Sequence, residues 1–112
     1  MSDVLETDPG ERGAARVRAT LWVEEVEGEN LTWRHTADVS ASGLFFDGAT
    51  PRIIDTPMQL RFTLPGGRVI NAKAKVVRTT WLAPRPGLAV RFVDLSAEDH
   101  AALVAFVAQT QT

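Results

Sequence analysis

Apolar and polar residues alternate with a period of two along most of the chain that follows Ala15. The first such run places Val17, Ala19, Leu21 and Val23 on one face and Arg18, Thr20, Trp22 and Glu24 on the other. Successive side chains of a strand point to opposite faces, so this alternation predicts a half-buried strand.

The same signal predicts five further strands, over 31–37, 43–46, 58–64, 70–76 and 88–92. Turn sequences rich in Gly and Pro separate most of these runs. The last segment has a helical period instead, with Ser96 as N-cap and an apolar stripe at Ala102, Leu103, Phe106 and Val107. The sequence therefore predicts a mainly all-β fold, a six-stranded antiparallel barrel with a C-terminal α-helix that covers one opening.

The length of 112 residues fits a single domain, which we place at 11–112, after a polar leader at 1–10 that we expect to be flexible. The 14 acidic residues outnumber the 12 cationic ones, whereas proteins that bind DNA or RNA by overall charge carry a positive excess. No cysteine is present, which excludes disulfides and thiol catalysis. Membrane-spanning runs and a signal-peptide core are also absent, so we expect a cytoplasmic protein without nucleic-acid partners or membrane insertion.

Two short polar motifs carry the candidate chemistry. Arg12 and Arg16 precede the first strand, and Asp38, Ser40 and Gly43 form an Asp-x-Ser-x-x-Gly segment between the second and third strands. Each motif has an ordinary explanation: the arginines could be solvated surface charge, and the segment has the composition of a turn, in which Gly accepts a positive φ. Taken together they match guanine, whose N7 and O6 accept from an arginine fork while its N1–H and N2–H₂ donate to a carboxylate. The second arginine and Ser40 suit phosphate oxygens.

The remaining polar and aromatic residues favour structural roles. We expect His35 to pack against the barrel and His100 to be solvated on the helix, and no spacing of carboxylates or cysteines completes a metal site. Trp22, Trp33 and Trp81 could stack on bases, but on strands of a small barrel we expect them to pack in the core or at its rim. No residues pair a nucleophile with a base, so we do not expect an enzyme.

The order and separation of the two motifs resemble the signature of PilZ domains, which are receptors for the bacterial second messenger cyclic di-GMP. The stretches AKVVR at 74–78 and GLAVRF at 87–92, and the closing helix, are similar to this family as well. The resemblance extends over residues 11–108. One departure is Glu11, which stands where many members have a basic residue, and it bears on whether the ligand binds as a monomer or as an intercalated dimer.

The resemblance implies that Arg12 and Arg16 clasp guanine and phosphate, that Asp38 and Ser40 receive and orient guanine, and that Gly43 keeps the turn open. It implies cyclic di-GMP as the ligand, with no other cofactor and no metal. It also implies a stand-alone adaptor, monomeric or weakly dimeric, that relays the signal to an unidentified effector protein. An alternative stays open: a protein-interaction module on the same fold that works without a nucleotide.

Overall fold

The computed structural model describes residues 15–49, 52–80 and 86–111. Within these ranges seven strand segments precede one helix: β1 (Arg16–Arg18), β2 (Trp22–Glu27), β3 (Asn30–Ser40), β4 (Gly43–Asp47), β5 (Pro57–Thr63), β6 (Val69–Thr80), β7 (Gly87–Asp94) and α2 (Ala97–Thr110). The leader expected at 1–10, the motif residue Arg12 and Trp81 lie outside the described residues.

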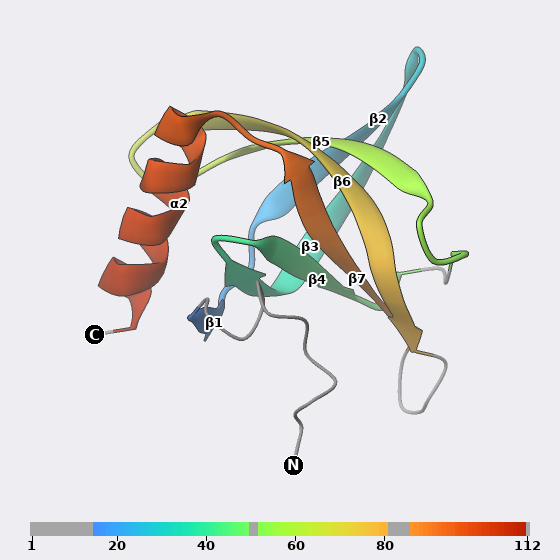
Figure 1. The fold of residues 1–112 in the computed structure, drawn as a ribbon, viewed down its shortest axis with the longest axis horizontal. Coiled ribbons are helices and arrows are strands. Elements are labelled where there is room, and N and C mark those ends of the chain that lie inside the picture. Colours follow the sequence, from blue (N-terminus) through green and yellow to red (C-terminus); the bar gives the residue numbers. More distant parts are fainter. Residues whose placement is uncertain (1–14, 50–51, 81–85, 112) are drawn as a thin grey trace.

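The strands form a closed antiparallel barrel (Figure 1). Neighbouring strands follow the order β3-β2-β5-β6-β7-β4, and β4 pairs with β3 to complete the circle. β1 pairs with the part of β3 that lies beyond the end of its pairing with β2, so β1 and β2 share one position in the barrel. The predicted six-stranded antiparallel barrel with its C-terminal helix is confirmed, and its first strand is broken into two segments.

A buried threonine accounts for the break in the first strand at residues 19–21. The Thr36 hydroxyl donates to the Ala19 carbonyl at 2.7 Å and accepts from the Leu21 N–H at 2.9 Å. Buried backbone groups require partners, and this side chain provides them where the regular ladder is interrupted. The break sets β1 apart from β2 and leaves it beside the C-terminal end of β3.

The barrel interior is built from the apolar faces that the alternation predicted in the first, fourth, fifth and sixth runs. Fully buried side chains come from six of the strands and include Val23, Leu60, Ile70, Val76 and Leu88. Burying side chains of this size contributes about 1.5–3 kcal/mol each. This core is what holds the closed sheet together and fixes the outward-facing residues in place.

The helix α2 packs across one end of the barrel, beside β1 and the turn between β5 and β6 (Figure 1). Leu103 and Val107 from its predicted apolar stripe belong to the common core. Ser96 is the N-cap, as predicted, and accepts from the Asp99 N–H at 3.0 Å. Asp99 is buried and accepts from Arg68 Nε at 3.0 Å, which fastens the first turn of α2 to the barrel.

β2 and β3 turn polar side chains inward near the hairpin. Glu25 is 4% exposed and accepts from Arg34 Nε and from Arg52 Nη2, each at 2.9 Å. Buried charges are tolerated when they are paired and hydrogen-bonded, and this cluster meets that condition. The inward face here is therefore an ion cluster rather than an apolar surface.

The aromatic residues of the same strands lie on the outer face. Trp22 and Trp33 are each 59% exposed, and His35 is exposed and meets the edge of Trp22 with ring centroids 5.4 Å apart. The expectations that His35 packs against the barrel and that these tryptophans fill its core or rim are wrong. His100 is exposed on α2, as predicted.

Candidate functional site

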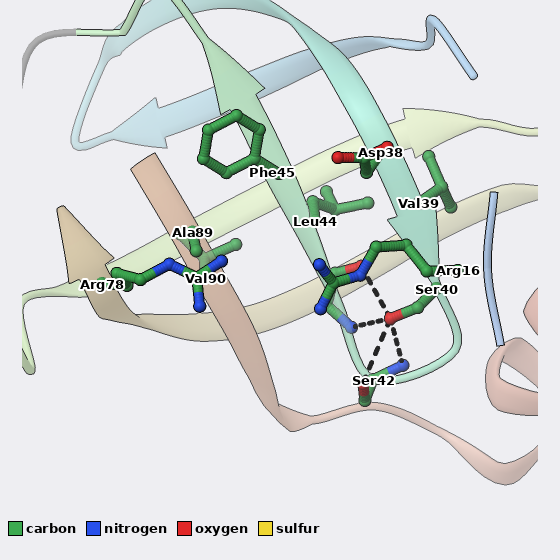
Figure 2. Close-up of a pocket in the computed structure, with 11 residues that line it drawn as sticks. Arg16, Asp38, Val39, Ser40, Ser42, Leu44, Phe45, Arg78, Ala89 and Val90 are labelled. Atoms are coloured by element: carbon green, nitrogen blue, oxygen red, sulfur yellow. Dashed lines mark hydrogen bonds between the residues drawn. The ribbon is translucent and has the colours of Figure 1, made fainter. Parts of the chain in front are cut away.

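The candidate site lies where the barrel closes, at the meeting of β1, β3 and β4. Arg16 is the cross-strand partner of Ser40, and Asp38 is the partner of Phe45 on the other side of β3. As a result Arg16, Asp38, Ser40 and Gly43 line one hollow in the surface, together with Phe45 and Arg78 among others. We call this hollow the arginine recess. Figure 2 shows Arg16 and Ser40 at one end of it and Arg78 at the other.

Ser40 shapes the turn between β3 and β4 through its hydroxyl group. Its Oγ accepts from the N–H groups of Ser42 at 3.2 Å and Gly43 at 3.1 Å, and it lies 3.2 Å from the Gly43 carbonyl and 3.1 Å from the Ser42 hydroxyl (Figure 2). A hydroxyl has one proton to donate and two lone pairs, so these contacts use its full capacity. Ser40 is 7% exposed, and in this structure it orders the turn that carries its neighbours.

Gly43 is required by a close approach of two strands rather than by an unusual backbone angle. A Cβ at this position would lie 2.1 Å from the Val90 carbonyl oxygen, a backbone atom of β7. Gly43 has no positive φ, so the ordinary turn explanation, in which glycine accepts a positive φ, does not apply at this position. The absence of a side chain instead lets β4 press against β7 at the edge of the recess.

A row of outward-facing residues crosses the site from strand to strand. The pairings Arg18 with Asp38, Asp38 with Phe45, Phe45 with Ala89 and Ala89 with Arg78 are continuous through β1, β3, β4, β7 and β6. Residues that are paired laterally in a sheet point to the same face. Asp38 and Phe45 are therefore neighbours on the outer surface, with cationic residues at both ends of the row.

Phe45 is held in the middle of this row by a glycine. A Cβ on Gly87 would lie 2.2 Å from Cζ of the Phe45 ring, so the ring is seated on the β7 backbone. The residue is half-buried and forms part of the wall of the recess. It offers a flat apolar surface beside the Asp38 carboxylate.

The local charge of the site differs from that of the whole chain, whose net charge is -2. Arg16 and Arg78 line the recess with the carboxylate of Asp38, and Arg18 stands at the end of its row, where a neighbouring hollow also includes Asp47. Arginine presents a planar fork of N–H donors that suits phosphates and base edges. The arrangement can therefore take a ligand that is anionic overall and that also offers donors to one carboxylate.

Sequence reasoning did not assign three residues of the recess and its row of outward-facing residues to the site: Arg18, Phe45 and Arg78. Arg78 stands in the AKVVR stretch that resembles the PilZ family, but nothing in the stretch alone assigns it a role. Its sequence distance from Asp38 is 40 residues, and only the cross-strand register brings the two together. The sequence-predicted Arg12 is not placed, because it lies outside the described residues.

Two other classes of site find no support in the described part of the chain. No cluster of histidine, cysteine and carboxylate side chains there is suited to hold a metal ion. None of its helices is long and apolar enough to cross a membrane.

The fold and the site define a small antiparallel β-barrel with an arginine-lined recess at the closure of its strands. The family model of the PilZ domain matches residues 11–109 of this chain. Because this match includes nearly the whole chain, the protein belongs to the PilZ domain family. No curated protein matched the chain.

Solved structures share the fold. The Bacillus subtilis inhibitor of motility, MotI/DgrA, superposes with a TM-score of 0.80 at 20% identity over 89% of this chain, which spans only 51% of that protein. The PilZ domain of YcgR from Escherichia coli, solved with c-di-GMP, gives 0.66 at 15% identity over 89% of this chain and 91% of that one. The PilZ domain of CeSA from a cellulose-synthesizing bacterium gives 0.63 at 20% identity over 88% and 99%. At such identities the likeness concerns the fold.

Proposed function

We propose that this protein binds cyclic di-GMP in the arginine recess and relays its presence to a partner protein. The observation that carries the proposal is that Arg16, Asp38, Ser40 and Gly43, from two separate motifs, line a single recess. Membership of the PilZ family and the presence of c-di-GMP in the YcgR structure support it. Arg12 is assigned to the same site on the strength of its motif alone.

The carboxylate of Asp38 distinguishes a guanine ligand from a generic anion. Guanine presents N1–H and N2–H₂ on one edge and the acceptors N7 and O6 on the other. Asp38 can accept from the first edge while an arginine fork donates to the second. Phe45, the cross-strand neighbour of Asp38, supplies a flat surface on which the base can stack, in the way aromatic side chains hold bases in other proteins.

The phosphates are the part of the ligand that the arginines and the turn would hold. Arg16 and Arg78 face the recess from opposite ends, so two phosphate groups on one ligand could each meet a guanidinium. The role of Ser40 follows from its hydrogen bonds: it keeps the β3–β4 turn in shape beside Arg16 rather than offering an unused hydroxyl. No step of bond making or breaking is part of this function.

The proposal is tested by calorimetry and thermal unfolding with cyclic di-GMP and, in parallel, cyclic di-AMP. At about 100 times the dissociation constant a ligand adds about 2.7 kcal/mol to the free energy of unfolding. Adenine presents a lone pair at N1 and a donor at N6, so both of its edges are mismatched, and buried unpaired polar groups cost about 1–3 kcal/mol each. We expect strong preference for the guanine ligand.

Substitutions at Asp38 show whether that preference comes from base recognition. Asp38→Ala should weaken cyclic di-GMP far more than cyclic di-AMP, and Asp38→Asn should be milder because its amide oxygen still accepts one hydrogen bond. Asp94→Ala, which removes an exposed carboxylate at the end of β7, is the matched control and should leave both affinities unchanged. Absence of binding by the wild type would refute the nucleotide function and leave a nucleotide-independent interaction module as the better account. Equal binding of the two dinucleotides would mean that the site holds phosphate without selecting the base.

A further inference from the structure

A second hollow lies beside the arginine recess, on the other side of Asp38 and Phe45. These two residues line both hollows. The recess continues from them towards the β3–β4 turn, through Ser40 and Gly43. The second hollow continues in the opposite direction along the same strands, and its other lining residues are Arg18, Ala19, Thr20, Ala37 and Asp47. We call it the Asp47 hollow.

The strand register places Asp47 next to the residues of the recess. Asp47 follows Phe45 by two positions on β4, so both side chains point to the same face of the barrel. Phe45 is paired with Asp38, which makes Asp47 a diagonal neighbour of Asp38, about 7–8 Å away. Arg18 is paired with Asp38 on its other side. Two carboxylates therefore stand next to the same aromatic ring, with an arginine within reach.

The two hollows differ in charge. Among the described residues, the recess is lined by two arginines, Arg16 and Arg78, and by one carboxylate. The Asp47 hollow is lined by one arginine and two carboxylates. Carboxylates repel a phosphate, but they accept hydrogen bonds from a neutral base that presents N–H donors. The recess therefore suits phosphate groups, and the Asp47 hollow suits a base.

Guanine is the base that matches the Asp47 hollow. Its N1–H and N2–H₂ can donate to the Asp47 carboxylate, and its N7 and O6 can accept from the fork of Arg18. The half-buried Phe45 ring, which borders both hollows, offers a flat surface on which a base can stack. Asp47 is half-buried too, so a mismatched base would leave it short of partners that water replaces only in part.

We propose that the Asp47 hollow is a second base subsite, which selects guanine through Asp47 and Arg18. This proposal rests on the receptor function proposed above, because a ligand with two bases is needed to fill both hollows at once. Asp38 receives one guanine of cyclic di-GMP and Asp47 receives the other, while the phosphates lie towards Arg16. The two guanines are identical in the ligand, but different residues of the protein read them.

The test is calorimetry of the full chain with three cyclic dinucleotides that carry the same two phosphates: cyclic di-GMP, cyclic di-AMP and the mixed cyclic GMP-AMP with the same linkages. The mixed ligand has one guanine, so it satisfies only one of the two carboxylates. An adenine facing the other carboxylate leaves polar groups unpaired. We expect the wild type to bind the mixed ligand about 5- to 150-fold more weakly than cyclic di-GMP, and more tightly than cyclic di-AMP.

Substitutions at the Asp47 hollow should remove this selectivity. Asp47→Ala should weaken cyclic di-GMP by about the same factor and leave the mixed ligand nearly unchanged, because the mixed ligand places its guanine at Asp38. Asp47→Asn should be milder, since its amide oxygen still accepts one hydrogen bond, and Arg18→Ala should also narrow the gap. The control, Asp94→Ala, removes an exposed carboxylate that lines neither hollow, and it should keep the full selectivity.

The second subsite is refuted if the wild type binds cyclic di-GMP and the mixed ligand equally. It is also refuted if Asp47→Ala weakens both ligands by the same factor, because Asp47 then supports the shape of the site and does not read a base. The two proposals fail in different ways. No binding of any dinucleotide would refute the receptor function and the subsite together. Preference for cyclic di-GMP over cyclic di-AMP that depends on Asp38, without discrimination against the mixed ligand, would refute the subsite alone.

Discussion

Arg16 is the residue of the first motif that the structure places at the site, and it is exposed at the end of the recess. Replacing it by Ala removes a bidentate contact worth about 1–3 kcal/mol, a loss of about 5- to 150-fold in affinity for cyclic di-GMP. Because the side chain is exposed, unfolding by urea should be nearly unchanged. Calorimetry measures the first effect and a denaturation curve the second.

Two further variants separate the shape of the guanidinium from its charge. Arg16→Lys keeps the charge but loses the planar fork, and it should recover only part of the affinity. Lys73→Ala removes a cation from an exposed position of β6 that does not line the recess, and it should bind like the wild type. A loss in Lys73→Ala as large as that in Arg16→Ala would mean that overall charge, and not the recess, governs binding.

Ser40 and Ser42 form a natural pair for testing how the turn is held. Ser40→Ala leaves the N–H groups of Ser42 and Gly43 without their acceptor, and an unsatisfied buried group costs about 1–3 kcal/mol. Ser42→Ala removes a hydroxyl that is hydrogen-bonded to the Ser40 hydroxyl, and it should cost far less. Urea denaturation should rank the two variants in this order, and the reverse order would contradict a structural role for Ser40.

The residues of the site could be predicted from sequence only where they are local to a motif. Asp38, Ser40 and Gly43 lie within six residues of one another, so their spacing alone indicates a common turn. Phe45 and Arg78 reach the same recess through pairings across β4, β7 and β6, and no local spacing encodes that register. The contact that excludes a side chain at Gly43 could not be predicted from the sequence either. The atom that would clash belongs to Val90, 47 residues away along the chain.

Among the elements, β2 and β3 show where a pattern of alternation misleads. A period of two assigns residues to two faces but does not state which face is inside. The apolar residues Leu31 and Trp33 suggest an inward face, yet Thr36 and Glu25 are the ones buried, because each finds hydrogen-bonding partners inside. β5 and β6 were predicted correctly because most of the residues that alternate with their buried ones, such as Arg61 and Lys73, are polar, and this shows which face is inside.

The ion cluster on β2 and β3 predicts how stability depends on pH. Burial alone would raise the pKa of Glu25, but hydrogen bonds and charges from Arg52 and Arg34 outweigh it and hold the pKa below 4.5. A carboxylate whose pKa is lower in the folded state contributes stability that is complete above about pH 5 and is lost as the pH falls through the folded-state pKa. We therefore expect the free energy of unfolding to fall in acid, partly through this group.

Glu25→Gln should remove that acid-dependent contribution and destabilise the protein near neutral pH. Breaking a buried ion pair costs about 3–5 kcal/mol, and the lower end applies because both arginines reach solvent. Glu24→Gln on the exposed pair with Arg61 is the control and should cost far less, because solvent screens exposed ion pairs. Urea curves at several pH values measure both, and an unchanged acid slope in Glu25→Gln would show that other groups control it.

For the molecule as a whole, closure of the barrel and formation of the site are the same event. Each strand from β2 to β7 has at least two neighbours, and the pairing of β3 with β4 that completes the circle also brings Asp38 beside Phe45. A closed barrel has no free strand edges, and edges appear only when a pair of neighbouring strands separates. A ligand that bridges β1, β3 and β6 at this junction therefore favours the fully closed state over every partly opened one.

This coupling predicts that cyclic di-GMP stabilises strands far from the recess. Leu60 and Ala72 are buried and paired across β5 and β6, outside the recess, so their amides should exchange with solvent only when the barrel unfolds. At a ligand concentration of about 100 times the dissociation constant, their hydrogen exchange should slow by about 100-fold, the same factor by which the folded state is favoured. Cyclic di-AMP at the same concentration should leave their exchange nearly unchanged. Slowing confined to amides around residues 16–18 and 40–45 would show instead that the junction opens locally, and that the barrel can stay folded while its site is lost.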